Sequence, residues 1–340
     1  MRKLLFLPIA LFAMISCETG EVNENTTAHI YTVGNKYLDG LFQGYITKDG
    51  VTTSFETGYF VQDLFVQGDD VYTSGDKDNG AAYTKNGVLT VLGDPIATHA
   101  TSIFVDGDDV YVVGKKDEHP AYWKNGVVTI LDVDSGCIGM AYDITISNGN
   151  VYIAGYQHNF STTNPITNIL YWENGTRHTV YSPHVYSFGW LGEISIAVDG
   201  DDVYMAVNER DMSSPTFNSN AYLITNGLQE TLIDDNSEVH DIYISDSDIY
   251  MCGDHITADG VPNQSVVWKN GTVLAEKPNL FGAYFCVVVV DGNVFAGGMD
   301  SLLLPDGSYQ RLDTLLINNV VEATPTPSGA TGYMSIVVTQ

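Results

Sequence analysis

The chain has 340 residues, of which 44% are hydrophobic, and a formal net charge of −28 from 14 basic and 42 acidic side chains. A surface this acidic repels phosphate backbones and anionic lipids, so the charge argues against nucleic-acid binding and against direct association with an anionic membrane surface. The apolar content is sufficient for a large core, and a single array of repeats accounts for a length that would otherwise suggest two domains.

The first residues read as an export signal. A basic pair, Arg2-Lys3, precedes an apolar run, Leu4–Ile15, that is too short to span a bilayer as a mature helix. The overlapping sequence Met14-Ile15-Ser16-Cys17 resembles a bacterial lipobox. This resemblance implies that residues 1–16 are a lipoprotein signal peptide, that Cys17 is acylated, and that the lipid is the protein's contact with the membrane. An ordinary secretory signal that ends in a cysteine is the alternative.

Residues 17–27 contain the polar, acidic stretch Glu18–Thr27 and read as a flexible tether that follows the lipidated cysteine. Acidic residues after the cysteine resemble the export signal of some surface-displayed lipoproteins. We therefore expect an extracytoplasmic protein, lipid-anchored to the outer membrane of the cell envelope, with display at the cell surface as a further expectation. The other cysteines, Cys137, Cys252 and Cys286, have spacings that suit neither a disulfide framework nor a zinc site.

Two short patterns recur along the mature chain. The first is a β-branched and aromatic strand that usually ends in glycine, at Ile30–Gly34, Val71–Gly75, Val110–Gly114, Val151–Gly155, Val203–Val207, Ile249–Gly253 and Val294–Gly298. The second is a turn of the Asn-Gly or Asp-Gly type, at Lys48–Gly50, Lys85–Gly87, Lys124–Gly126, Glu173–Gly175, Thr225–Gly227, Lys269–Gly271 and Pro305–Gly307. Copies of the first pattern begin 41, 39, 41, 52, 46 and 45 residues apart, about the length of one four-stranded propeller blade.

Asn-Gly and Asp-Gly favour two-residue hairpins, because a type I′ turn needs positive φ at both central residues. Each repeat therefore predicts four antiparallel strands, designated a to d, and seven such sheets protect their edges by packing radially. The first copy lacks strand a, and the C-terminal Ser335–Val338 matches strand a at Ser102–Val105. The sequence predicts an all-β, seven-bladed β-propeller of four-stranded antiparallel blades over residues 28–340, with the ring closed by the C-terminal strand pairing into blade 1.

The element Ala121–Gly126 (AYWKNG), echoed at Tyr171–Gly175 and Val267–Gly271, resembles the bacterial extracellular propeller repeats of the HAF and kelch-like kind. The resemblance covers nearly all of the mature chain and implies a propeller fold in an extracytoplasmic setting. Such families include many members without an assigned activity, so the resemblance by itself implies no reaction.

The connections from strand b to c and from strand d to a vary between repeats and emerge on one face of a propeller, where function concentrates. The b–c connection is predicted to lengthen over Tyr156–Ile169, Asn208–Asn220 and Asp254–Ser265 in blades 4 to 6. Aromatic and histidine side chains in the d–a connections give the candidate binding residues Tyr181, His184, Tyr186, Phe188, Trp190, Tyr284 and Phe285. Exposed rings at a concave mouth suit stacking on sugars or anchoring a protein partner. Alternatively, the rings pack on each other and plug the channel.

Aligning the innermost strands without gaps places one small polar residue at the same position in each blade: Asp63, Ser102, Asp143, Ser195, Asp241, Cys286 and Ser335. If these side chains lie at the channel mouth, Asp63, Asp143 and Asp241 form a carboxylate ring whose mutual repulsion raises some pKa values or recruits a cation. The alternative is that these side chains cap backbone amides.

Histidine spacings predict no metal site, and the chain has no motif for a bound cofactor. Calcium at acidic turns such as Asp106–Asp109 is a further hypothesis, with a role as plain hairpin turns as its alternative. The leading interpretation is a non-enzymatic cell-envelope lipoprotein that binds a glycan or an envelope protein through its variable face, for which we expect no catalytic residues. The alternative is a glycan-active hydrolase or lyase that uses Asp63, Asp143 and Asp241.

Overall fold

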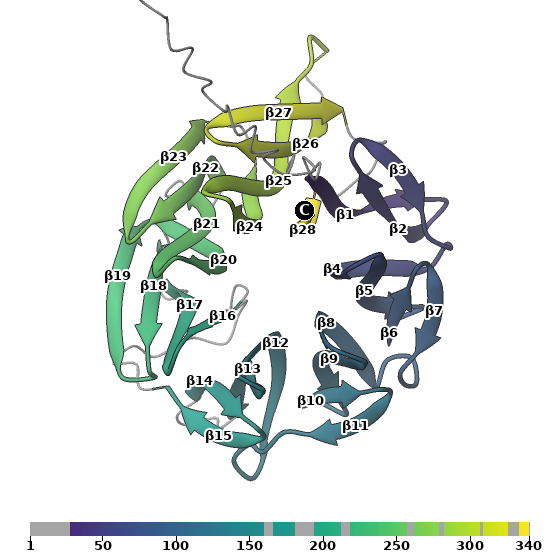
Figure 1. Cartoon of the computed structure of the whole chain (residues 1–340), viewed down its shortest axis with the longest axis vertical. Helices are drawn as coiled ribbons and strands as arrows, with labels where there is room; N and C mark the ends of the chain where they lie inside the picture. Colours follow the sequence, from purple (N-terminus) through teal and green to yellow (C-terminus); the bar gives the residue numbers. More distant parts are fainter. Residues whose placement is uncertain are drawn as a thin grey trace, which may run out of the picture.

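The computed structural model describes residues 28–159, 166–180, 194–211, 218–256, 262–278, 282–306, 309–325 and 333–339, and the structural statements below concern these residues. They form 28 strands in seven four-stranded antiparallel sheets. The sheets stand radially around a central axis, which is the predicted seven-bladed propeller (Figure 1). Within the described ranges, the structure has no helix with the length and apolar character needed to cross a bilayer. The predicted signal peptide and tether, with Cys17, lie outside these ranges.

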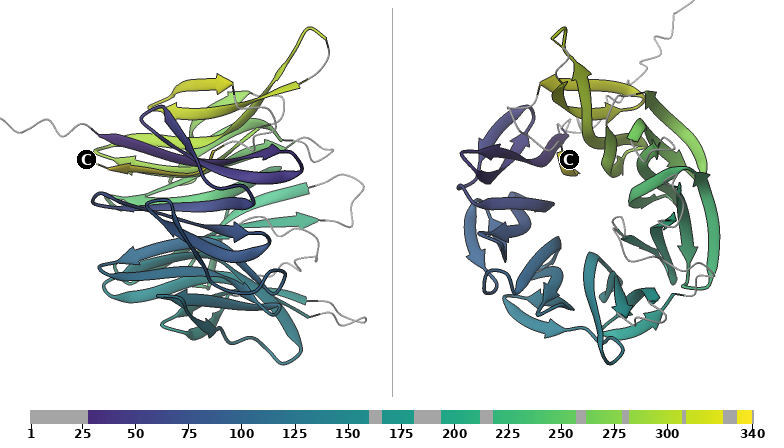
Figure 2. Two further views of the ribbon diagram at one scale, coloured as in Figure 1. Left: turned by 90° about the vertical axis from the view of Figure 1, so that its right-hand side faces the viewer. Right: turned by 180° about the vertical axis from the view of Figure 1, so that it is seen from behind.

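Seen from the side, the strands of each blade run between the two faces of the ring (Figure 2). In the order a to d, blades 1 to 4 consist of β28 (Tyr333–Thr339), β1 (His29–Leu38), β2 (Leu41–Lys48), β3 (Val51–Ser54); β4 (Tyr59–Gln67), β5 (Asp70–Lys77), β6 (Gly80–Lys85), β7 (Val88–Val91); β8 (Thr98–Asp106), β9 (Asp109–Lys116), β10 (His119–Lys124), β11 (Val127–Ile130); and β12 (Cys137–Ser147), β13 (Asn150–Asn159), β14 (Ile166–Glu173), β15 (Thr176–Thr179). Blades 5 to 7 consist of β16 (Ser195–Asp199), β17 (Asp202–Asp211), β18 (Asn218–Thr225), β19 (Gln229–Asp235); β20 (Ser237–Ser245), β21 (Asp248–Ile256), β22 (Pro262–Lys269), β23 (Thr272–Pro278); and β24 (Ala283–Val290), β25 (Asn293–Leu303), β26 (Tyr309–Ile317), β27 (Val320–Pro325).

The ring closes where the C-terminal strand joins the first blade. β28 pairs antiparallel with β1, with Ser335 opposite Val33 and Val338 opposite Ile30. Figure 1 shows β28 beside β1 on the inner side of the ring. The predicted closure is confirmed, and strands from both ends of the sequence share one sheet.

The recurring Lys-Asn-Gly turn joins the two hairpins of a blade through contacts with the start of strand b. In blade 3, Asn125 and Gly126 have φ of 50° and 80°, as a type I′ turn requires. The Asn125 side chain accepts a hydrogen bond from the Val110 backbone N–H at 2.9 Å and donates one to Asp109 Oδ1 at 2.7 Å. Lys124 Nζ lies 2.7 Å from Asp109 Oδ2 and 5.0 Å from the centre of the Tyr111 ring. These contacts explain why Asp-Val-Tyr and Lys-Asn-Gly recur together.

The predicted turn of blade 7 was misplaced. Pro305 and Asp306 lie between β25 and β26, which is the b–c connection. The c–d turn of this blade is Asn318-Asn319, with φ of 46° and 69°, and Asn318 Oδ1 accepts the Val294 N–H at 3.0 Å as Asn125 does for Val110. Asparagine tolerates the left-handed conformation, so a second asparagine can replace the glycine. The turn therefore lacks the Asn-Gly pair that marks it in the other blades.

The core lies between the blades. The described buried apolar side chains form seven clusters, each made by two neighbouring blades, including the pair formed by blades 7 and 1. Trp123, Trp172 and Trp268 on the strands c of blades 3, 4 and 6 are fully buried in these clusters. Each blade therefore depends on both neighbours for its core, which favours a closed ring over an open array.

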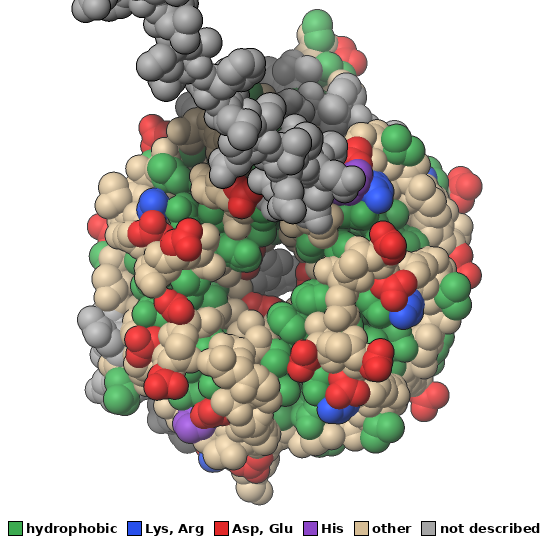
Figure 3. Space-filling view, viewed as in Figure 1, with side chains coloured by type: hydrophobic (Ala, Val, Ile, Leu, Met, Phe, Trp, Pro, Cys, Tyr) green, Lys and Arg blue, Asp and Glu red, His purple; other side chains and the backbone are tan. Residues whose placement is uncertain are grey.

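The described ends of the long b–c connections expected in blades 4 to 6 are strand. β13 and β14 pair up to Asn159–Ile166, β17 and β18 up to Asp211–Asn218, and β21 and β22 up to Ile256–Pro262. The hairpins are longer than predicted because pairing continues past the repeat boundary. On the face shown in Figure 3, acidic side chains are scattered over the described surface, which is hollowed at the centre.

Candidate functional site

In six of the seven blades, a β-bulge on the innermost strand turns one side chain toward the central channel. The register of strands a and b shifts between Val61 and Asp63, Ala100 and Ser102, Ala141 and Asp143, Val239 and Asp241, and Tyr284 and Cys286, and a similar shift occurs beside Ser335 in blade 1. Each bulge leaves one residue without a direct partner across the ladder.

The glycine that ends strand b makes room for the bulge. A Cβ atom built on Gly114 would overlap the backbone carbonyl of His99 on the neighbouring strand. The same backbone conflict arises at Gly75, Gly155, Gly253 and Gly298. Blade 5 has Val207 at this position. Its first strand, β16, begins only at Ser195, so β16 and β17 do not pair along the part of the strand where the other blades have the bulge. The repeated glycine and the bulge thus belong to one structural feature, since the glycine leaves room for the bulged strand.

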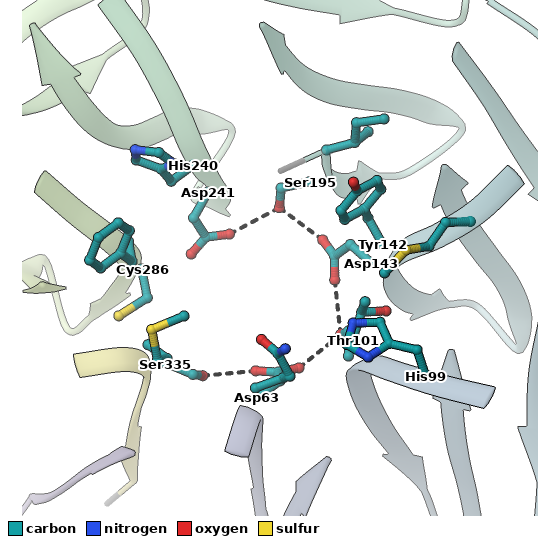
Figure 4. Close-up of a pocket in the computed structure, with 16 residues that line it drawn as sticks. Asp63, His99, Thr101, Tyr142, Asp143, Ser195, His240, Asp241, Cys286 and Ser335 are labelled. Carbon is teal, nitrogen blue, oxygen red and sulfur yellow. Dashed lines mark hydrogen bonds between the residues drawn. The ribbon is translucent and has the colours of Figure 1, made fainter. Parts of the chain in front are cut away.

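A cavity of about 370 Å³ occupies the channel mouth. The small polar residues aligned in the sequence all line it: Asp63, Ser102, Asp143, Ser195, Asp241, Cys286 and Ser335. Figure 4 shows the labelled members with their side chains directed to the centre. The expectation that one position from every blade meets at the channel is therefore met, and we call these seven residues the inner ring.

The aspartates of the inner ring join neighbouring blades through hydrogen bonds. Asp63 Oδ1 accepts from Ser335 Oγ at 2.8 Å and Leu64 N at 2.7 Å, and its Oδ2 accepts from Ser102 Oγ at 2.8 Å and Ile103 N at 3.0 Å. Asp63 therefore connects blades 1, 2 and 3, and all four of its in-plane acceptor positions are in use.

Asp143 repeats this pattern one pair of blades further on. Its Oδ2 accepts from Ser195 Oγ at 2.8 Å and Ile196 N at 2.9 Å, and its Oδ1 lies 3.1 Å from Ser102 Oγ and accepts from Ile144 N. Asp241 follows in blade 6, where Oδ1 lies 3.0 Å from Ser195 Oγ and accepts from Ile242 N, and Oδ2 accepts from Val287 N at 2.9 Å. The backbone-capping alternative is supported together with the carboxylate ring.

The ring has more serine–aspartate contacts than serine hydroxyl protons. Five serine–aspartate contacts involve only three hydroxyl groups, those of Ser102, Ser195 and Ser335, and each hydroxyl donates a single proton. Two of the five contacts are hydrogen bonds only if a carboxyl group is the donor. All five are satisfied when two protons are shared among the three aspartates, which leaves one net negative charge on the ring.

The pKa directions agree with this proton count. Burial in the channel raises the pKa of Asp143 to about 6, with a further rise from the charge of Asp63 that backbone and serine hydrogen bonds offset in part. Burial likewise raises the pKa of Asp241 to about 7, and the charge of Asp143 adds to it. Burial also raises the pKa of Asp63. These directions favour protonated forms of Asp143 and Asp241 in mildly acidic solution.

The odd number of blades interrupts the alternation of serine and aspartate. Serine stands in blades 1, 3 and 5 and aspartate in blades 2, 4 and 6, so blade 7 falls between Asp241 and Ser335 and cannot continue the pattern on both sides. Cys286 occupies this position, is buried, and has its thiol 3.5 Å from the carbonyl oxygen of Gly297. A thiol is only a weak hydrogen-bond donor. In blade 7 it therefore takes the place of a serine or aspartate that could continue the alternation on one side only.

A second ring lies beside the inner ring and differs in every blade. It consists of the residues that directly precede the inner ring, which also line the cavity: Gln62, Thr101, Tyr142, Ile194, His240, Phe285 and Met334. Six of them are the bulge residues described above, and Ile194 is their counterpart in blade 5. We call this set the outer ring. It combines two aromatic rings, an imidazole, an amide and a hydroxyl with aliphatic surface, which suits selective binding of a small group.

The sequence-predicted binding residues fall into three groups. Phe285 lies in the outer ring, with its ring centre 5.2 Å from that of His240. Tyr284 is only 1% exposed and packs in the core between blades 6 and 7, so its ring is not available at the mouth and we leave it out of the site. Tyr181, His184, Tyr186, Phe188 and Trp190 lie outside the described residues.

Sequence reasoning missed the outer ring, although the same gapless alignment contains it one column earlier. The signal is that this column never repeats a residue type. A strict two-residue alternation predicts that the side chain before an inward-facing residue points away from the channel. The bulge cancels that alternation.

Among the described residues, Glu238, His240 and Asp254 form one cluster of metal-type ligands, with a donor atom of each within 4.8 Å of the others. Cross-strand pairing of Glu238 with Asp254 and the bulge at His240 create the cluster, so residue spacing gave no sign of it. His240 Nε2 lies 2.8 Å from Asp254 Oδ1, and Asp254 is 1% exposed. This contact engages the imidazole nitrogen with a carboxylate, and we assign no metal here.

Calcium at the acidic turns stays a prediction. Both oxygens of Asp109 are engaged by Lys124 and Asn125, and hydrogen bonds from these side chains lower the pKa of Asp109. The same arrangement holds at Asp70 and Asp248. These contacts support the role of these aspartates in hairpin geometry.

No protein-family model matches the sequence, and no curated protein matches it. Solved structures are similar in fold. The acylaminoacyl peptidase of Pyrococcus horikoshii is 13% identical with a TM-score of 0.50, over 88% of this chain and 50% of the peptidase chain, so this chain spans half of that protein. The β-propeller domain of the Trilobed protease of Pyrococcus furiosus (12% identical, TM-score 0.49) is matched over 87% of this chain and 91% of its own. Polysaccharide lyase Uly1 (11%, TM-score 0.49) is matched over 85% and 88%. At such identities the likeness concerns the fold alone.

Proposed function

We propose that this protein is a non-enzymatic binding module of the cell envelope, which holds a glycan or a partner protein at the channel mouth. The observation that carries the proposal is the contrast between the two rings. The inner ring repeats small polar residues that tie blades together, whereas each bulge presents a different side chain to the same cavity. Residues that the fold constrains repeat, and residues free of that constraint differ, which is expected of a binding surface on a rigid scaffold.

Removing one aromatic ring of the mouth is expected to weaken binding about tenfold. A soluble Cys17→Ser protein is first screened on a glycan array and by pulldown from envelope extract. The affinity of the strongest ligand is then compared for the parent, Phe285→Ala and Tyr142→Ala by calorimetry. Val127→Ala is the control, because Val127 is exposed on an outer strand far from the cavity. Unchanged affinity in both aromatic variants, with unchanged melting, contradicts a role for the outer ring.

A glycan-active hydrolase or lyase is the second candidate. The raised pKa values of Asp143 and Asp241, about 6 and about 7, favour it because a general acid works best near the operating pH. Against it, protein groups already contact all four in-plane positions of the Asp143 carboxyl and three of the four of Asp241, so that only Asp241 Oδ2 has a position open to a substrate. The two candidates differ in what is recovered after binding. An intact ligand after long incubation supports the binding module, and shortened or unsaturated products support the enzyme.

Anchoring through Cys17 is part of the proposal. It is supported by the sequence Met14–Cys17 after an apolar run and by the polar stretch that follows. In a bacterial host with the lipoprotein pathway, we expect the full chain to incorporate labelled palmitate and to fractionate with the outer membrane. Cys17→Ser is expected to lose both properties, while Cys137→Ser, which alters a buried cysteine of the propeller, retains them. Equal labelling of the two variants contradicts the anchor.

A further inference from the structure

The β1–β2 hairpin of blade 1 carries exposed aromatic side chains at its tip. β1 continues to Leu38, four residues beyond Gly34, whereas β5 of blade 2 ends at Lys77, two residues beyond the equivalent Gly75. The additional length presents Tyr37 and Phe42, which are 50% and 41% exposed. Among the described large hydrophobic side chains that are exposed, these two are the only aromatic ones. Their position together is unlike the single exposed valines of the outer strands.

A line of rings leads from this tip toward the channel. The ring centres of Tyr37 and Phe42 are 5.1 Å apart, and those of Phe42 and Phe60 are 4.9 Å apart, both in edge-to-face contact. The Gly58 N–H donates to the Phe42 carbonyl oxygen at 2.7 Å, which fixes the start of blade 2 against the hairpin. The three rings line a cavity of about 500 Å³.

This second cavity shares a wall with the channel mouth. Gln62 and His99 line both cavities. His99 is held in place by the contact of its Nδ1 with the Asp76 carboxylate, and Asp76 also accepts the Ala100 N–H at 3.1 Å. The shared residues make the two cavities adjacent parts of one surface that runs from the axis across blade 2 to blade 1.

Both carboxylates along this path have partners. Asp76 contacts the His99 imidazole, and Asp78 is paired with Lys77 at 2.9 Å. The remaining side chains of the lining are the three rings, the amides of Gln62 and Asn79, and the aliphatic Leu41. The chain as a whole carries a net charge of −28, which repels an anionic polymer. Rings alternating with neutral polar groups suit an uncharged polyhydroxylated chain, since its apolar faces stack and its hydroxyls find hydrogen-bonding partners.

We propose that the cavity lined by Tyr37, Phe42 and Phe60 is a second subsite, and that one neutral oligosaccharide occupies it and the channel mouth together. This inference rests on the proposed binding function and specifies its ligand as an uncharged glycan chain rather than a single sugar. The channel mouth holds one end of the chain, Gln62 and His99 contact its middle, and the hairpin tip binds the far end. Affinity then increases with chain length until both cavities are filled.

The test uses the soluble Cys17→Ser protein and neutral hexose oligosaccharides of two to six units in several linkages, with affinity measured by calorimetry. The parent is expected to bind the longest effective chain at least tenfold more tightly than the shortest that binds. The double variant Tyr37→Ala/Phe42→Ala is expected to lose this gain while its affinity for the short chain stays unchanged. Both side chains are substantially exposed, so an unchanged melting curve is the check on folding. Val88→Ala is the control for an exposed apolar residue elsewhere.

The following results overturn the inference. Affinity that is independent of chain length, or a double variant that equals the parent, removes the second subsite and leaves the channel-mouth proposal intact. If Phe285→Ala loses short-chain binding and affinity shows no gain with chain length, the second subsite is likewise removed and the channel-mouth proposal stays intact. Binding of no neutral oligosaccharide, together with a protein or peptide that the parent captures and the double variant does not, replaces the glycan with a protein partner. Absence of any oligosaccharide binding without such a partner overturns both the subsite and the glycan reading of the mouth.

Discussion

Gly114→Ala is expected to lower the free energy of unfolding by about 3 kcal/mol or more, although it adds a single methyl group. The added Cβ would overlap the carbonyl oxygen of His99, which belongs to the backbone of the neighbouring strand and not to a side chain that can rotate away. Relief requires β8 to separate from β9 at the bulge. That movement disturbs Ser102 and the hydrogen bonds it makes to Asp63 and Asp143. Denaturant unfolding followed by far-ultraviolet circular dichroism measures the effect.

Gly44→Ala is the matched control, because Gly44 is also a strand glycine outside the positive-φ region. The nearest atoms to its added Cβ are Phe55 Cδ2 at 3.1 Å and Val61 Cβ and Cγ1 at 3.2 Å, so a small shift of these side chains suffices, whereas Gly114 meets a carbonyl oxygen in direct overlap. A much smaller loss of stability is expected there. Similar losses for the two variants would mean that crowding in general, and not the backbone approach at the bulge, explains the repeated glycine.

The ring architecture could be predicted from sequence because its causes are local and repeated. Turn chemistry at Asn125-Gly126 and the alternation in Val110–Gly114 act within one blade, and the match of Ser335–Val338 to another strand a needs no knowledge of distant contacts. The inner ring could be aligned for the same reason. The error at Pro305–Gly307 arose where an asparagine replaced the usual glycine at Asn319, so that the sequence pattern and the turn conformation no longer coincided.

The outer ring and the second cavity depend on features that no local pattern encodes. Whether Phe285 faces the channel depends on a bulge, which is set by the close approach of two strands. Whether Phe42 meets Phe60 depends on how far the β1–β2 hairpin extends before it turns and on how blades 1 and 2 pack. Tyr284 shows the converse: its neighbour faces the cavity, whereas Tyr284 itself is buried in the core. An aromatic residue near a loop is therefore weak evidence for a binding role.

The protein is expected to be more stable near pH 5 than near pH 8, because the inner ring binds protons when the chain folds. The pKa of Asp143 rises from its ordinary 3.8 to about 6, and that of Asp241 rises to about 7. The folded state therefore holds protons that the unfolded state releases as pH rises above 4, so stability falls through the window from about pH 4 to 7 and is fully present below it. For each of these two groups, the loss of unfolding free energy across this window is on the order of 3 kcal/mol. Asp313, whose pKa also rises to about 7, adds to the same slope.

Asp241→Asn separates the ring from the general effect of a net charge of −28, which also makes acid conditions favourable. Asparagine does not titrate, and its NH₂ group cannot accept the backbone N–H that a carboxyl oxygen accepts from Ile242 or Val287. The variant is therefore expected to be less stable than the parent, with a larger deficit at pH 5 than at pH 8, where the parent must hold a buried charge.

Asp108→Asn removes the same formal charge from an exposed turn and serves as the control. Its dependence of unfolding free energy on pH should remain parallel to that of the parent, whereas Asp241→Asn should flatten it. Chemical denaturation at half-unit steps from pH 4.5 to 8 provides the comparison. Parallel curves for the parent and both variants would show that Asp241 titrates as an ordinary surface carboxyl, and the proton-sharing ring would have to be abandoned. A flattened curve for Asp241→Asn alone would locate the proton at the bridge between blades 5, 6 and 7, beside the cavity in which the ligand is expected.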